Sequence, residues 1–297
     1  MSKERIEALL GLSGPPLRAI PAADPVVPDH ELLRRIGQGS YGEVWLARSV
    51  AGTHRAIKVV YRDHFHDARP YEREYAGMLR FEPLSRSNEG FVDILQLGRK
   101  DAEGFFYYVM ELADDATKAG EGDQCSVITD QSGATESRQP LNTVFNAATY
   151  APRTLSTVLS QHHRLPVPEC VGLGINLNLA LGHLHRHGLI HRDVKPANII
   201  FVGGVPKLAD IGLVADIAGA NTFVGTEGFI PPEGPNSPQA DIYALGKLLY
   251  EASMGKDRHE FPEPFTRMEA AADAEELLEL NAVILKACAS ATRRPRT

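Results

Sequence analysis

The sequence predicts an α+β fold, and three observations support this prediction. Strand-like segments follow one another through residues 29–112, whereas helical patterns prevail in residues 113–297. A chain of 297 residues is long enough for one large domain or for two lobes that share a site. Hydrophobic residues make up 43% of the chain, which argues against disorder over most of its length.

Composition excludes several classes of protein. The net charge is −7 and the charges are interspersed, so nothing indicates nucleic-acid binding. The three cysteines, Cys125, Cys170 and Cys288, have no metal or redox spacing, which suits a reducing compartment. No apolar run reaches the length of a membrane span, and the N-terminus lacks a signal-peptide core. We therefore expect a cytoplasmic chain.

Residues 1–28 are expected to form an N-terminal extension or linker. Residues 11–28 are dense in proline and glycine, a composition that packs against a folded body at most locally. No function follows from this segment.

A glycine-rich turn between two strand-like segments is the first candidate ligand site. Residues 37–44 have the sequence GQGSYGEV. Glycines let a backbone approach phosphate groups closely and leave its amides exposed. For this motif alone, a glycine-rich hairpin without a ligand is the alternative. A dinucleotide fingerprint would need a helix at the last glycine, but Glu43–Leu46 favours a strand.

A lysine inside an apolar strand follows the glycine-rich turn. Lys58 lies in the middle of Ala56–Val60, where a lysine would ordinarily face solvent on an edge strand. The next segment, Ala68–Phe81, has the apolar spacing of a helix and carries two acids, Glu72 and Glu74.

Two further strands precede a long polar segment. Phe91–Gly98 and Phe105–Leu112 are joined by a polar turn and predict a hairpin. Residues 114–152 are rich in Asp, Gly, Ser and Thr, and we expect an insertion that is mostly a surface excursion without a role.

Helices are expected to begin at Leu155 and near Pro168. From Val171 to Leu181 the apolar residues occupy every odd position, which by itself favours a strand, but the segment is long and its leucines also fit a helical face. Three histidines at positions 183, 185 and 187 would diverge around such a helix, so a solvated helix end is expected instead of a metal site.

A polar loop follows these helices. Residues 191–198, HRDVKPAN, place a carboxylate, an ammonium and a carboxamide within six residues, at Asp193, Lys195 and Asn198. Pro196 lacks a backbone donor and biases the residue before it away from helix. The segment is therefore predicted to be a loop that holds polar groups in a fixed arrangement.

This loop resembles the catalytic loop of protein kinases, and other motifs of that family follow in the family's order. They are the glycine-rich turn, the strand lysine, a D-I-G at residues 210–212, a G-T at 225–226 and a P-P-E at 231–233. The resemblance covers roughly residues 31–297 and is nearest to eukaryote-like bacterial serine/threonine kinases. It implies an antiparallel-sheet N-lobe with one helix (29–112) and a mainly helical C-lobe (113–297) that ends before the family's final helix.

The resemblance also implies roles for individual residues. Asp193 would position the acceptor hydroxyl, Lys195 would stabilise the transferred phosphoryl, and Asn198 and Asp210 would bind Mg²⁺. Lys58 would hold the ATP phosphates, paired with Glu74 or, failing that, Glu72. The residues placed around ATP are Gly37, Gln38, Gly39, Ser40, Tyr41, Gly42, Val44, Ala56, Lys58, Met110, Glu111, Ala113 and Ile200.

Regulatory residues come from the same resemblance. Thr226 would bond Asp193 and Lys195, and Thr222 lies where such kinases are often phosphorylated, with Arg192 as the phosphate's partner. Asp241 would bond the backbone of the H-R-D turn, and Arg294 would pair with Glu233. The chain departs from the family's pattern at Ile211, where phenylalanine is usual, and at Ala215, where a second basic residue is usual.

The implied activity is transfer of the γ-phosphoryl of Mg-ATP to serine or threonine in protein substrates. Tyrosine specificity stays open, and the oligomeric state is not predicted. A pseudokinase that binds nucleotide or acts as a scaffold is the alternative. A small-molecule kinase is a third hypothesis, but such enzymes lack the P-P-E-like segment and the G-T pair.

Overall fold

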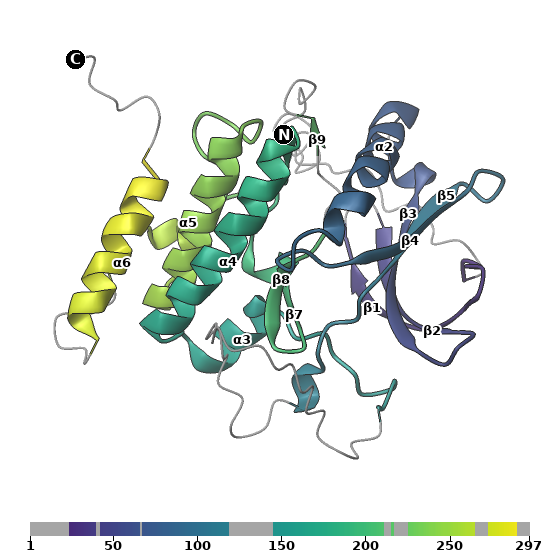
Figure 1. Ribbon diagram of the computed structural model, residues 1–297, viewed down its shortest axis with the longest axis horizontal. Helices are drawn as coiled ribbons and strands as arrows, with labels where there is room; N and C mark the ends of the chain where they lie inside the picture. Colours follow the sequence, from purple (N-terminus) through teal and green to yellow (C-terminus); the bar gives the residue numbers. More distant parts are fainter. Residues whose placement is uncertain are drawn as a thin grey trace, which may run out of the picture.

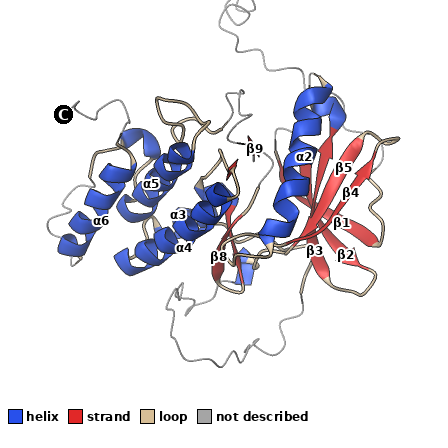
Figure 2. Cartoon of the chain, turned by 45° about the horizontal axis from the view of Figure 1, so that its top comes forward, coloured by secondary structure: helices blue, strands red, loops and turns tan. Residues whose placement is uncertain are grey.

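The computed structural model has two lobes, one built on a sheet and the other on helices (Figures 1 and 2). It describes residues 24–39, 42–65, 67–118, 145–210, 215–216, 225–264 and 273–289. The α+β prediction is confirmed. Among the described helices, none combines the length and apolar character needed to span a membrane.

The N-lobe sheet has five antiparallel strands in the order β1-β2-β3-β5-β4. Their bounds are β1 His30–Gln38, β2 Gly42–Ser49, β3 His54–Tyr61, β4 Ile94–Lys100 and β5 Phe105–Met110. Side chains alternate between the two faces of a strand. In β3, Ala56 and Val60 accordingly join the main core, whereas Ile57 and Val59 join a second apolar cluster. Lys58 shares its face with Ala56 and Val60.

Helix α2, Ala68–Ser85, lies along the sheet (Figure 2). Asp67 caps it by accepting a hydrogen bond from the backbone N–H of Arg69. Pro70 lies in the first turn, where its missing N–H would have no partner in any case, so the helix starts before the proline and not after it. Met78 and Phe81 are fully buried against the sheet, which orients Glu74 on the same helix toward the interior.

The helical lobe consists of α3 Leu155–His162, α4 Val167–Arg186, α5 Pro238–Met254 and α6 Ala274–Ala287. In α4 the odd-position apolar residues divide into two faces, because residues four apart lie above one another on a helix. Leu173, Leu177 and Leu181 are buried; Val171, Ile175 and Leu179 are exposed. This division explains how a helix produced a strand-like apolar pattern.

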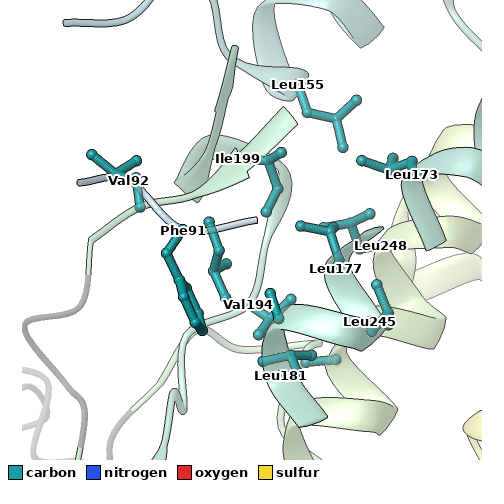
Figure 3. Close-up of a cluster of buried hydrophobic side chains, with 14 of the residues drawn as sticks. Phe91, Val92, Leu155, Leu173, Leu177, Leu181, Val194, Ile199, Leu245 and Leu248 are labelled. Atoms are coloured by element: carbon teal, nitrogen blue, oxygen red, sulfur yellow. The ribbon is translucent and has the colours of Figure 1, made fainter. Parts of the chain in front are cut away.

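The polar loop at residues 191–198 is held in place by apolar residues that pack into the core. Val194 and Ile199 are fully buried and lie among the leucines of α4 and α5 in Figure 3, including Leu177 and Leu248. A 3-10 helix at Pro196–Asn198 shapes the end of the loop. Short strands flank it: β6 Leu189–Ile190 pairs with β9 Ala215–Asp216, and β7 Ile199–Val202 pairs with β8 Val205–Leu208.

The strand predicted to begin at Phe91 begins at Ile94 instead. Phe91 lies outside β4 and forms a single bridge with Leu208 of the helical lobe. Strand β5 ends at Met110, and the chain then passes into the segment that leads to the insertion. Several predicted features lie outside the described residues: Ser40, Tyr41, Ile211, Thr222, Arg294 and residues 119–144.

Candidate active site

A cavity of about 460 Å³ brings together side chains from both lobes. Most of the residues that the sequence placed around ATP and Mg²⁺ line it. These are Gly37, Gln38, Gly39, Val44, Ala56, Lys58, Glu74, Met110, Glu111, Ala113, Asp193, Lys195, Asn198, Ile200 and Asp210. Segments that lie more than 150 residues apart in sequence therefore form one concave site.

The glycine-rich turn is a tight connection between β1 and β2. The N–H of Gly39 donates to the carbonyl of Gly42 at 2.8 Å. A Cβ on Gly42 would lie 2.1 Å from the carbonyl oxygen of Val59, so only glycine lets β2 approach β3 here. Gly42 thus supports the turn by packing, without lining the cavity itself.

Lys58 is buried, and its ammonium forms an ion pair with the carboxylate of Asp210. Burial disfavours the charged form of Lys58, but Asp210, Tyr108 and Glu74 together outweigh burial and raise the pKa of Lys58 above its ordinary value. Burial also acts against the charged form of Asp210, and Lys58 reverses that effect, so the pKa of Asp210 is lowered. Both groups are charged at neutral pH.

Glu74 lies in the same cavity but does not make the predicted ion pair with Lys58. Its Oε1 is buried and has no hydrogen-bond partner. Burial raises the pKa of Glu74 to about 8, against the opposing effect of Lys58. The fallback is excluded as well, because Glu72 is held by the guanidinium of Arg99 at 2.6 and 2.7 Å. Among the residues that the structure describes, Asp210 is the carboxylate in ion-pair distance of Lys58.

Replacing Glu74 with glutamine is expected to flatten the pH dependence of stability. A folded-state pKa raised from 4.5 to about 8 stabilises the fold below pH 4.5 and loses this contribution as the pH rises through 8. Glutamine cannot ionise, so the variant does not lose this contribution. Relative to wild type, the free energy of unfolding of Glu74→Gln should increase by roughly 2–5 kcal/mol between pH 5 and pH 9. Urea unfolding at several pH values measures the difference.

Glu72→Gln is the matched control on the same helix. Its pKa is lowered by the hydrogen bond with Arg99, so its contribution to stability changes only below pH 4.5. Between pH 6 and pH 9 its unfolding free energy should run parallel to that of wild type. If the unfolding free energy of Glu74→Gln also runs parallel to that of wild type across this pH range, the pKa of Glu74 is not raised.

Four polar side chains form a closed hydrogen-bond network around Asp193. Lys195 Nζ lies 2.8 Å from Asp193 Oδ2 and donates to Thr226 Oγ1 at 2.8 Å. Thr226 Oγ1 in turn donates to Asp193 Oδ1 at 2.6 Å. Asn198 Nδ2 donates to Asp193 Oδ2 at 2.9 Å and to the Asp193 carbonyl at 2.8 Å. The carboxylate of Asp193 is thereby fixed at the floor of the cavity.

The backbone that carries Asp193 is held by Asp241 of α5. The carboxylate of Asp241 accepts the N–H groups of His191 at 2.9 Å and Arg192 at 2.8 Å. Arg192 has a φ of 71°, a left-handed conformation that non-glycine residues seldom adopt, so the turn needs this support. The resemblance had implied this bond from Asp241.

His185 is a member of this support that the sequence did not reveal. Its Nε2 lies 2.8 Å from Asp241 Oδ2, so it is not the solvated side chain that we expected at the helix end. His183 and His187 contact one another instead, with ring centroids 4.6 Å apart. Among the residues that the structure describes, no group of three or more His, Cys, Asp or Glu side chains is placed to hold a metal.

Two oxygen donors nevertheless face the cavity where a magnesium ion would bind with a nucleotide. Asn198 uses its amide nitrogen on Asp193, which leaves its carbonyl oxygen for another partner. Asp210 uses Oδ1 on Lys58, which leaves Oδ2. Mg²⁺ in phosphate-transfer sites takes one or two such protein oxygens and completes its shell with phosphate and water. The donor set at Asn198 and Asp210 therefore fits Mg²⁺.

The segment after β5 forms the apolar end of the cavity. Glu111 is clamped by Lys207, whose Nζ lies 2.6 Å from Glu111 Oε2, and by the N–H of Asp93 at 2.9 Å. Met110 and Ala113 line the cavity beside it. Sequence reasoning missed seven further lining residues: Ile36, Tyr108, Tyr150, Pro152, Thr154, Ala197 and Ala209. Of these, Ile36 directly precedes the glycine motif, and Tyr108 could have been inferred from its alternation with Met110.

Tyr150 and Pro152 belong to the segment that we expected to be a surface excursion without a role. Tyr150 is only 2% exposed, and its hydroxyl donates to the carbonyl of Ala113 at 3.0 Å. The prediction is wrong for this part of the insertion, because its aromatic residues pack against the body. Nothing in the polar composition of residues 114–140 indicated such packing.

Comparison with known proteins agrees with this geometry. The model of the protein kinase domain family matches residues 124–289, more than half of the chain. The chain is 27% identical over 239 residues to the DNA damage-responsive serine/threonine-protein kinase RqkA of Deinococcus radiodurans, covering 76% of this chain and 30% of that protein. It is 37% identical over 112 residues to the serine/threonine-protein kinase PknL of Mycobacterium tuberculosis, covering 34% of this chain and 28% of that protein.

A probable serine/threonine-protein kinase of Clostridium perfringens is 26% identical over 240 residues, or 76% of this chain and 29% of that protein. The chain thus spans less than a third of the length of these relatives. All three are bacterial, as the resemblance implied. The chain belongs to the protein kinase domain family.

Proposed function

We propose that the chain is a serine/threonine protein kinase that transfers the γ-phosphoryl group of Mg-ATP to protein hydroxyls. The observation that carries the proposal is the meeting of two charged clusters in one cavity. One is the pair of Lys58 and Asp210, and the other is Asp193 with Lys195, which Thr226 joins by hydrogen bonds. Phosphoryl transfer depends mostly on positioning and electrostatic stabilisation, and these groups supply both.

In the proposed reaction the acceptor hydroxyl oxygen attacks the γ-phosphorus as the bond to the ADP oxygen breaks. Asp193 orients the hydroxyl and takes its proton, because its carboxylate is held in place by Thr226 and Asn198. Lys195 is near enough to Asp193 to stabilise charge on the phosphoryl oxygens during transfer. Lys58 would bind the ATP phosphates, with the buried Glu74 behind it.

Asn198 and Asp210 are the proposed magnesium ligands. When bound, the ion neutralises phosphate charge that the protein's lysines alone would not balance. The ion pair between Lys58 and Asp210 joins two side chains that both line the cavity. Asp210 has a φ of 55°, and aspartate tolerates this left-handed conformation better than most residues do.

We also propose that the chain is located in the cytoplasm and that it phosphorylates itself at Thr222. A location in the cytoplasm is supported by Cys170 and Cys288, which are buried and not joined in a disulfide. Autophosphorylation at Thr222 is supported by its spacing from Thr226 and by Arg192 beside Asp193.

Replacing Thr226 with alanine is expected to lower kcat by roughly 10- to 100-fold. The change removes the hydroxyl that links Lys195 to Asp193, and both charged groups then lose one fixed contact. The Thr226→Ser variant keeps the hydroxyl and should retain most of the activity. Steady-state kinetics at saturating Mg-ATP measures both variants, and equal losses for alanine and serine would show that the hydroxyl is not what matters.

A turnover assay with generic protein acceptors tests the proposed function. The purified chain is incubated with Mg-ATP and casein or myelin basic protein, and the phosphorylated amino acids are then identified. We expect phosphoserine or phosphothreonine, formed only with a divalent cation. Phosphotyrosine alone would overturn the specificity. Nucleotide binding without any transfer would favour the pseudokinase hypothesis.

A further inference from the structure

The end of the predicted insertion lines the cavity and contacts the N-lobe. We call residues 111–116, which follow β5, the hinge, and residues 145–154, which lead into α3, the hinge strap. Arg34 of β1 donates from Nε to the carbonyl of Ala147 at 3.1 Å and from Nη2 to the carbonyl of Tyr150. Arg34 is half-buried, and more than 110 residues separate it from its two acceptors.

An aromatic contact adds a second link to the sheet. The ring of Phe145 lies 4.0 Å from that of His54 at the start of β3, centroid to centroid. Phe145 also lies 5.4 Å from Tyr150, so the rings of the hinge strap form one row from β3 to the cavity. Two strands of the N-lobe are thus connected to a segment that belongs to the helical lobe.

The hinge strap is also bonded to the hinge itself. The Tyr150 hydroxyl donates to the carbonyl of Ala113, and the N–H of Arg153 donates to the carbonyl of Asp114 at 2.8 Å. The N–H of Ala116 donates to the carbonyl of Ala151 at 2.8 Å. Because Tyr150 and Ile36 both line the cavity, the strap and β1 form part of one wall.

We infer that the hinge strap positions ATP by limiting how far the N-lobe can move from the hinge. The inference rests on the proposed ATP binding and goes beyond it, because it assigns roles to Arg34 and Tyr150 as positioning residues. Separating β1 from the hinge would break both bonds from the Arg34 guanidinium, which is charged and half-buried. Nucleotide release requires such separation, so the strap should slow release and lower the Kd and KM for ATP.

The experiment compares Arg34→Ala, Arg34→Lys and Tyr150→Phe with wild type. Arg34→Ala should raise the Kd and KM for Mg-ATP about tenfold, the effect of losing hydrogen bonds from a charged donor, while kcat at saturating ATP changes less than about twofold. Lysine can restore one of the two bonds, so Arg34→Lys should lie between. Tyr150→Phe keeps the ring and loses only the bond to Ala113, so its KM should rise by about threefold.

Arg48→Ala is the matched control. Arg48 lies on the neighbouring strand β2, opposite His54 of β3, and pairs with the exposed Glu31 at 2.6 Å. No hydrogen bond joins Arg48 to the strap residues that the structure describes. This variant should bind ATP as wild type does. Hydrogen exchange adds an independent readout: the amides of residues 111–116 should exchange faster in Arg34→Ala than in Arg48→Ala.

The outcomes separate this inference from the proposed function. If wild type binds Mg-ATP and Arg34→Ala and Tyr150→Phe bind it equally well, the inference is wrong and the proposed function stands. If the variants lose kcat in proportion to kcat/KM, or match Arg48→Ala in exchange at the hinge, a positioning role is overturned. If wild type binds no nucleotide, the proposed function itself fails.

Discussion

Replacing Asp193 with asparagine is expected to lower the rate of phosphoryl transfer by at least about 10³-fold while leaving the fold and nucleotide binding intact. The carboxylate of Asp193 is the acceptor for Thr226, Asn198 and Lys195. Asparagine has nearly the same shape but cannot take a proton from the acceptor hydroxyl. The NH2 group of its side chain would also face one of these hydrogen-bond donors and could not accept from it. Initial rates with a protein acceptor measure the loss.

The control for this variant is an exposed carboxylate outside the cavity. Asp101→Asn removes an acid that pairs with Arg62 and Arg99 at the surface, and it should keep wild-type rates. Circular dichroism and ATP binding establish that Asp193→Asn is folded. A rate within tenfold of wild type would exclude Asp193 as the group that receives the proton.

Replacing Lys58 with methionine is expected to lower kcat/KM for ATP by about 10²- to 10³-fold and to abolish detectable autophosphorylation. Methionine fills the space of the lysine stem but removes the ammonium. The Asp210 carboxylate then loses the counter-charge of Lys58, and the phosphates lose a buried cation. Mass spectrometry of the chain after incubation with Mg-ATP detects the loss.

Lys100→Met is the matched control for this change. Lys100 lies at the end of β4 and makes a long ion pair with Glu103 at 3.6 Å, so its loss should change neither activity nor stability appreciably. Thermal unfolding should show that both methionine variants are folded. Wild-type autophosphorylation in Lys58→Met would contradict the assigned role of Lys58.

Local sequence was sufficient to predict the loop that carries Asp193. Its polar residues lie within six positions of the sequence. Val194, the apolar residue between them, is fully buried, which holds the loop against the core. The strands and most helix positions followed for the same reason, because alternation and four-residue spacing are set by backbone geometry. The order of motifs then placed the two lobes around one site.

Partners that depend on three-dimensional packing could not be predicted. Which carboxylate pairs with Lys58 depends on how the side chains pack, and Glu74 and Asp210 both line the same cavity. His185 contacts Asp241 across 56 residues, and nothing in its neighbourhood along the chain distinguishes it from His183. Tyr150 reaches the cavity from an insertion whose composition indicated only a surface loop.

Titration of ATP into the Asp193→Asn variant, followed by calorimetry with and without magnesium, tests the central claim most directly. The claim is that Lys58, Asn198 and Asp210 surround one metal-bound triphosphate. We expect at least about tenfold tighter binding with magnesium than with EDTA, and we expect this difference to disappear when Asp210→Asn is added. Absence of binding under both conditions, or an unchanged magnesium preference without the Asp210 carboxylate, would contradict the claim.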